Sequence, residues 1–234
     1  MRPMRTLRWL NALALAVAMP WLAAPLQAAD PSQFSIAEKR LFVDDHLGGI
    51  RGPATLEYAY SKRGSLEGPV DDTARVIVGP PAKQGGASVK VEYLSDTRKL
   101  ELSDIDAANA NPIVLFFLER DVREMHRLTG GSVSYYRKRI RMALAEGGQV
   151  ESVTRSVGAR RIAATEIRVA PYRDDPARSR YEKFAEKIYV FTLSDDVPGK
   201  VVELRSELSS MPAAAGQARD IMIAESVRFV GQRR

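Results

Sequence analysis

The sequence lacks cysteine altogether and has only two histidines, His46 and His126, among its 234 residues. The absence of cysteine excludes disulfides, thiol catalysis, cysteine-bound zinc, iron–sulfur clusters and any lipid anchor linked through cysteine. With so few histidines we expect neither a metal nor a cofactor. Because no nucleophile elbow, phosphate-binding loop or dinucleotide fingerprint occurs either, we expect that the protein is not an enzyme.

A large surplus of charge of one sign is also missing once the first residues are set aside. The formal charge of +6 comes from 35 basic and 29 acidic residues. Residues 1–28 contain three arginines and no acid, so they supply half of this surplus. With no long basic run outside one short stretch, we expect no nucleic-acid partner.

Residues 1–28 have the composition of a secretory signal peptide. Basic residues are followed by an apolar stretch from Trp9 to Leu22, and small residues follow around Ala28. This order is typical of a cleaved signal, and we predict cleavage after Ala28. An uncleaved membrane anchor is the alternative, although the stretch is short for a span of ~20 residues. We therefore expect an exported, periplasmic protein that is soluble after cleavage, with a mature chain at 29–234.

Alternating apolar and polar residues predict strands on both sides of the centre of the chain. Leu56, Tyr58 and Tyr60 share one face of a first strand, after a short helical pattern at 36–47. Eight further strands are expected at 75–78, 88–93, 99–102, 150–157, 163–169, 188–193, 202–208 and 221–229. Short strands separated by turns favour one antiparallel sheet, and so large a sheet coils because its strands twist.

The centre of the chain has the spacing of two helices. Asn111 and Pro112 are suited to start the first helix, and Gly130 to end it. Ser132 is suited to cap the second helix. We therefore predict an α+β fold with one domain, a strongly curled antiparallel sheet of about nine strands that forms an open half-barrel. An antiparallel helical hairpin inserted at 112–146 packs on its concave face.

This order of elements resembles a known family. The stretch Lys187–Leu204, which reads KIYVFTLSDDVPGKVVEL, is similar to a two-strand hairpin common among related exported proteins. Together with the signal peptide and the sheet with helices in its hollow, it resembles the periplasmic lipoprotein-carrier fold and related uncharacterised exported families. The resemblance implies an apolar cavity that carries acyl chains or another hydrophobic cargo. Such folds also serve as partner-binding modules with filled cavities.

Two sets of side chains are candidates for binding. The candidates for lining a hydrophobic ligand site are Phe116, Phe117, Met125, Tyr136, Tyr58 and Tyr60. The candidates for contacting a headgroup or a partner are Arg137, Lys138 and Arg141. The aromatic residues are equally typical of a core, and the basic stretch is equally typical of a solvated helix face.

Catalytic and metal sites are weaker interpretations. Glu119, Arg123 and His126 share one helical face, which suits acid–base chemistry but equally suits a routine ion pair at a surface. His46 lies beside Asp44 without the spacing of a metal site.

We therefore hypothesise a non-enzymatic, exported cell-envelope protein that binds or carries a hydrophobic, lipid-like ligand. In this hypothesis the ligand gains access when the helices move aside, and the basic helix receives an anionic headgroup. The alternative is a periplasmic structural or assembly partner of another envelope protein, without a ligand. The basic helix also allows peripheral contact with an anionic membrane surface.

Overall fold

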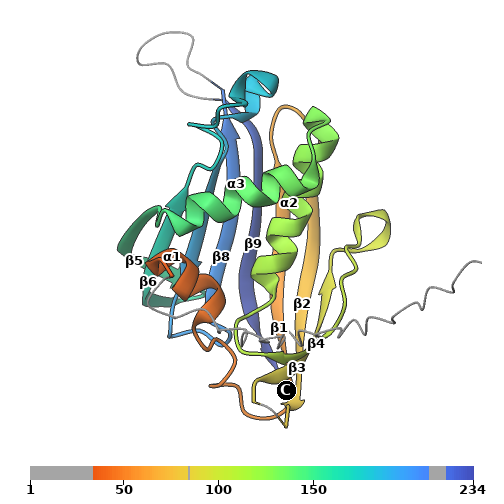
Figure 1. Ribbon diagram of the computed structural model, residues 1–234. Coiled ribbons are helices and arrows are strands. Elements are labelled where there is room, and N and C mark those ends of the chain that lie inside the picture. Colours follow the sequence, from red (N-terminus) through yellow and green to blue (C-terminus); the bar gives the residue numbers. More distant parts are fainter. Residues whose placement is uncertain (1–33, 84, 211–219) are drawn as a thin grey trace, which may run out of the picture. The chain divides into compact units, whose positions relative to one another are not determined.

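The computed structural model describes residues 34–83, 85–210 and 220–234, which form one sheet with helices on one of its faces (Figure 1). The predicted signal peptide at 1–28 lies outside the described residues. The helices are α1 (Ile36–Glu38), continued by a π-helical turn (Lys39–Val43), α2 (Ile113–Thr129) and α3 (Val133–Ala145). The strands are β1 (Ala54–Arg63), β2 (Val70–Pro81), β3 (Ala87–Tyr93), β4 (Ile105–Ala108), β5 (Gln149–Val157), β6 (Arg160–Val169), β7 (Ile188–Leu193), β8 (Val201–Ser209) and β9 (Ile221–Arg233).

The strands form a nine-stranded antiparallel sheet, in the order β4-β3-β2-β1-β9-β8-β7-β6-β5. This confirms the predicted α+β class and the antiparallel sheet. The first and last strands pair with each other, with Tyr60 opposite Val227, so the two halves of the chain are joined in the middle of the sheet. Among the described residues β4 and β5 are the edge strands, and the sheet is therefore open.

The fourth strand lies further along the chain than predicted. Leu100, at the centre of the predicted strand 99–102, makes only an isolated bridge to Tyr93. Between them Leu94 and Asp96 adopt positive φ angles of 63° and 49°, which turn the chain away from the sheet. The chain pairs with β3 again only at Ile105–Ala108.

The first helical segment ends at Val43 instead of continuing to Leu47. It begins with a capping box, in which the Ser35 hydroxyl accepts a hydrogen bond from the Glu38 amide and the Glu38 carboxylate accepts one from the Ser35 amide. His46 and Leu47, beyond its end, are buried.

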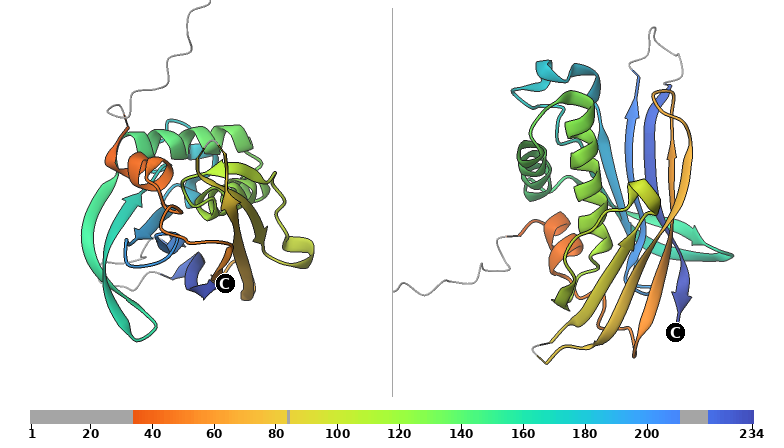
Figure 2. Two further views of the ribbon diagram at one scale, coloured as in Figure 1. Left: turned by 90° about the horizontal axis from the view of Figure 1, so that it is seen from below. Right: turned by 90° about the vertical axis from the view of Figure 1, so that its right-hand side faces the viewer.

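Helices α2 and α3 lie within the predicted range 112–146, but α3 crosses α2 where an antiparallel hairpin was predicted (Figures 1 and 2). Gly130 ends α2 with a φ of 73°, and the Ser132 side chain caps α3. At Gly131 a Cβ atom would lie 2.2 Å from the Tyr136 hydroxyl, so a larger residue here would displace the buried Tyr136 ring. That hydroxyl also contacts Thr129 Oγ1 at 2.6 Å, which fixes the start of α3 against the end of α2.

All three helices lie on the same face of the sheet, seen edge-on in the right-hand view of Figure 2. The core between the two layers contains aromatic side chains from both, including Tyr58 and Tyr60 of β1 and Phe191 of β7. No helix in the described part of the chain is long and apolar enough to cross a lipid bilayer.

Candidate functional site

The six residues predicted to line a ligand site all belong to this core. Their side chains are at most 2% exposed: Tyr58, Tyr60, Phe116, Phe117, Met125 and Tyr136. The ring of Phe117 packs edge-on against Phe191 of the sheet, with the centroids 6.4 Å apart. Phe116 packs against Tyr93 at 5.9 Å. The six residues thus contact other protein side chains, and their role in ligand binding stays a prediction.

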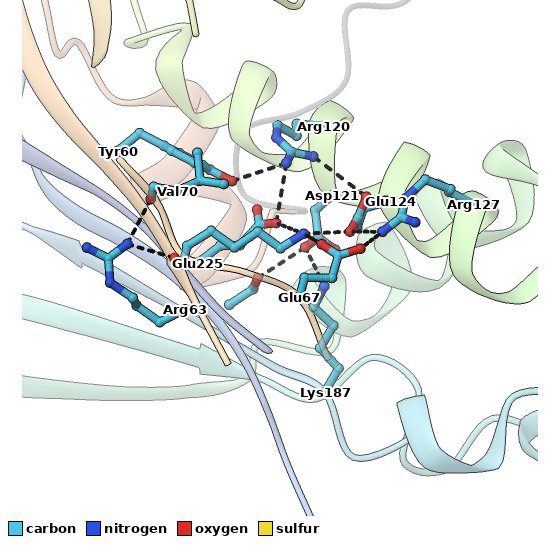
Figure 3. Close-up of polar contacts among 12 residues, drawn as sticks. Tyr60, Arg63, Glu67, Val70, Arg120, Asp121, Glu124, Arg127, Lys187 and Glu225 are labelled. Carbon is cyan, nitrogen blue, oxygen red and sulfur yellow. Dashed lines mark hydrogen bonds and ion pairs between the residues drawn. The ribbon is translucent and has the colours of Figure 1, made fainter. Parts of the chain in front are cut away.

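The second half of α2 meets the sheet through charged side chains (Figure 3). We call this set the ionic cluster; it contains as many cations as anions. Its members are Lys62, Glu67, Arg120, Asp121, Glu124, Arg127, Lys187 and Glu225. The set extends from fully buried pairs under α2 to the exposed Arg127 at its rim.

Asp121 is the most deeply buried member of the ionic cluster. Its carboxylate accepts hydrogen bonds from Lys187 Nζ at 2.5 Å, from Ser206 Oγ at 3.1 Å and from the Tyr189 hydroxyl. Asp121 is 0% and Lys187 1% exposed. A charge buried to this extent is tolerated only when it is paired and hydrogen-bonded, as Asp121 is.

Glu124 and Glu225 occupy contrasting surroundings in the ionic cluster. Burial opposes ionisation of Glu124, but hydrogen bonds from Arg127 and Lys62, each 2.7 Å long, outweigh it and lower the Glu124 pKa to about 2. Burial instead raises the pKa of Glu225, which lies 3.5 Å from Lys62 Nζ and 3.6 Å from Arg120. Together these contacts join α2 to β1 and β9.

The ionic cluster was not predicted from the sequence, although a signal was present. Lys62 continues the alternation of Tyr58 and Tyr60 on the inward face of β1. Lys187 similarly precedes Tyr189 by two residues. Charged residues at inward positions of separate strands indicate buried partners, because an unpaired charge there would be strongly unfavourable.

A groove lined by α2 and α3 lies on the side of α2 where Leu115 is exposed. We call it the outer groove; its volume is about 480 Å³. Its apolar lining comes from four separate segments: Phe42, Leu102, Leu115, Leu118, Val122, Ile140 and Leu144. Leu115 is 48% exposed and Leu102 37% exposed. A concave apolar surface of this size falls within the range of small-molecule sites.

Charged side chains complete the lining of the outer groove. The Glu119 carboxylate accepts hydrogen bonds from Arg123 Nε at 3.0 Å and from Arg137 at 2.8 and 2.9 Å. Burial opposes ionisation of Glu119, but these hydrogen bonds outweigh it and lower the Glu119 pKa. Arg141 also lines the outer groove, and no carboxylate among the described residues lies within ion-pair distance of its side chain.

The structure separates the residues of the predicted basic stretch. Arg137 and Arg141 line the outer groove, whereas Lys138 is exposed outside its lining. Arg139 is turned toward Asp175, with its Nε 3.0 Å from the carboxylate. Successive helical residues are rotated by about 100°, so a run of basic residues cannot form one face.

The two histidines have structural contacts. His126 Nδ1 lies 2.7 Å from the Gly131 carbonyl oxygen, so its ring joins the end of α2 to the following turn. At His46 the Nδ1 atom accepts a hydrogen bond from the Asn111 amide at 3.0 Å, which assigns the ring proton to Nε2, 2.8 Å from the Arg40 carbonyl oxygen. Both ring nitrogens of His46 are therefore engaged. Among the described residues, no group of three or more metal-ligating side chains gathers.

A larger hollow of about 620 Å³ lies between the end of α3 and the ends of β6, β7 and β8. Its lining includes Arg168, Arg173, Glu186 and Glu207. Charges of both signs are spread through this lining, and polar residues outnumber apolar ones in it. The outer groove is therefore the better candidate for a hydrophobic ligand.

Neither the family models nor the curated proteins compared with the chain give a match. Among solved structures, the crystal structure of the lipoprotein LppX from Mycobacterium tuberculosis is similar over 75% of this chain and 84% of LppX. The two chains are 11% identical, and the TM-score is 0.28. A similarity of this size assigns neither a family nor a ligand to the chain.

Proposed function

We propose that this protein is an exported, non-enzymatic binding protein for a hydrophobic, lipid-like ligand. The observation that carries the proposal is the outer groove, an apolar concavity of about 480 Å³ with guanidinium groups along it. Burial of a ligand's apolar surface against Leu115 and Leu118 would supply the binding free energy, about 0.8 kcal/mol for each methylene group. The arginines would contact a polar headgroup.

The proposal also gives a reason for the architecture. In it, the open sheet curls around α2 as a half-barrel, as twist favours for a large antiparallel sheet. The half-barrel contacts one side of α2 and keeps the helix in place. The side of α2 that faces solvent is then free to bind a ligand. The resemblance of the element order to the periplasmic lipoprotein-carrier fold supports the same class of function and the same cellular location.

Mass spectrometry under native conditions tests this proposal directly. Protein purified without detergent is expected to carry a bound lipid-like molecule, or to take up a fluorescent fatty acid with saturable, one-to-one binding. Denaturation should release the bound molecule for identification. A ligand-free mass together with no uptake of the fluorescent fatty acid would contradict the proposal.

A structural or assembly role is the second candidate, and the filled core favours it. The side chains that were predicted to line an internal cavity, such as Phe116 and Phe117, are packed against other residues. In this case the outer groove would receive a side chain of another envelope protein. That role predicts no bound lipid and no uptake of the fluorescent fatty acid, so the same measurement separates the two candidates.

A further inference from the structure

We propose that the outer groove binds a single-chain amphiphile with one negative charge, that Arg141 contacts its headgroup, and that Glu119 limits the charge that the site accepts. This inference rests on the proposed function and specifies its site and its ligand class. It places the ligand on the solvent side of α2, away from the core residues predicted from the sequence.

The apolar part of the outer groove suits one alkyl chain. Its floor is formed where α2 and α3 cross, by Leu118 and Val122 of α2 and by Ile140 of α3. Phe42 and Leu102 extend it from two other segments. With a volume of about 480 Å³ it lies toward the lower end of the usual range for ligand sites, ~300–1,000 Å³. The size therefore favours a slender ligand over a lipid with several chains.

The charges of the outer groove favour an anionic headgroup. Three guanidinium groups line it, from Arg123, Arg137 and Arg141, against the single carboxylate of Glu119. Guanidinium groups bind carboxylate and phosphate oxygens through paired hydrogen bonds. A cationic headgroup would be repelled, and a neutral one would gain only the apolar contacts.

The ion pairs explain why one negative charge should be preferred. Glu119 already engages both Arg123 and Arg137, at 3.0 and 2.8 Å. Arg141 is the lining guanidinium without a carboxylate partner among the described residues. One anionic group can pair with Arg141 without disturbing Glu119. A doubly charged group would have to compete with Glu119 for a second arginine.

Four compounds that share a dodecyl chain and differ in their headgroup test this inference. They are laurate, dodecyl phosphate, dodecyl maltoside and dodecyltrimethylammonium, each titrated below its micelle concentration at pH 8 by calorimetry. Dodecyl phosphate carries close to two charges at this pH. The unmodified protein is expected to bind laurate most tightly, about threefold to fivefold more tightly than dodecyl maltoside. Equal affinity for all four compounds would overturn the inference.

Two arginine substitutions test whether Arg141 contacts the headgroup of the ligand. Arg141→Gln is expected to weaken laurate binding about threefold to fivefold and to leave dodecyl maltoside binding unchanged. Arg161→Gln is the matched control, because Arg161 is exposed on β6, away from the outer groove. An equal loss of laurate affinity in both variants would indicate unspecific attraction and overturn the role of Arg141.

Glu119→Gln tests the selectivity. This substitution releases Arg123 and Arg137, so the affinity for dodecyl phosphate should rise about fivefold and exceed the change for laurate. An unchanged ratio of the two affinities would contradict the role of Glu119.

The substitution Leu115→Ser tests where the alkyl chain of the ligand lies. It should weaken the binding of all four compounds. If Leu115→Ser and Arg141→Gln both bind laurate like the unmodified protein, the inference is overturned while the proposed function stands. If no dodecyl compound binds and the native mass is ligand-free, the proposed function and the inference fail together. The circular dichroism of each variant shows that its fold is retained.

Discussion

Each side of α2 departs in one respect from the usual pattern of a surface helix. Toward the sheet, α2 presents Phe116 and Phe117 in its first half and the buried charges of Asp121 and Glu124 in its second half. Toward solvent it presents charged residues such as Arg123 and Arg127, but also Leu115, which is 48% exposed. Helices of globular proteins usually bury an apolar stripe and expose the charged one.

This difference indicates which side of α2 is available to a ligand. A ligand between α2 and the sheet would have to displace packed aromatic rings and separate buried ion pairs. Leaving one buried charge without its partner costs about 3–5 kcal/mol. A ligand in the outer groove requires no movement of α2. The access route expected from the sequence, displacement of the helices, is therefore the more costly of the two.

The largest effect on the free energy of unfolding is expected from removing a buried charge on the side of α2 that faces the sheet. Asp121→Ala leaves the buried Lys187 without its partner and should lower the free energy of unfolding by about 3–5 kcal/mol, measured by urea denaturation. The double substitution Asp121→Leu with Lys187→Met removes both charges and should restore a large part of this loss. A loss below about 1 kcal/mol for Asp121→Ala would show that α2 is not held by the ionic cluster.

Neighbouring residues on the two sides allow a direct comparison. Phe116 is 2% exposed and Leu115 is 48% exposed. Phe116→Ala should lower the free energy of unfolding by about 3–4 kcal/mol because it leaves a cavity in the core. Leu115→Ala should lower it by less than about 1 kcal/mol. Similar losses for both variants, in the same denaturation experiment, would remove the distinction between the two sides.

A smaller effect on the free energy of unfolding, which depends on pH, is expected from His46. Its ring contacts Asn111, just before α2 begins. Burial lowers the pKa of His46 below its usual 6.5, and the nearby Lys200 and Arg40 add to this, against the hydrogen bond to the Arg40 carbonyl and the charge of Asp44. Below pH 6.5 the unfolded chain therefore binds more protons at this residue than the folded protein. The stability present above pH 6.5 should fall as the pH falls below it, by at most about 1.4 kcal/mol per pH unit.

The variant His46→Gln isolates this contribution. Glu225 has a raised pKa because it is buried, and its contribution to stability changes with pH in the opposite direction. The difference between the unmodified protein and the variant cancels this second contribution. Urea denaturation between pH 5 and 8 should therefore show that, as the pH falls, the unmodified protein loses stability relative to His46→Gln. Equal slopes would mean that His46 does not titrate differently on folding.

The strands and helices could be predicted from the sequence because their signals are local. The alternation through Leu56, Tyr58 and Tyr60 is a property of neighbouring residues, and so is the glycine that ends α2. The strand predicted at 99–102 was wrong because alternation does not reveal a turn of the backbone such as that at Leu94. Aromatic residues were correctly considered as possible core, but their packing partners could not be named.

The sequence by itself determined most of the secondary structure, the antiparallel sheet and the balance of charge, because each depends on composition or on short-range periodicity. Only the tertiary structure decided that β1 pairs with β9, that Lys62 meets Glu124 and that Lys187 meets Asp121. It also decided that Leu102, Leu115 and Ile140 share one groove with Arg141. Contacts between residues so far apart in the chain depend on how the layers pack, and no local pattern specifies that packing.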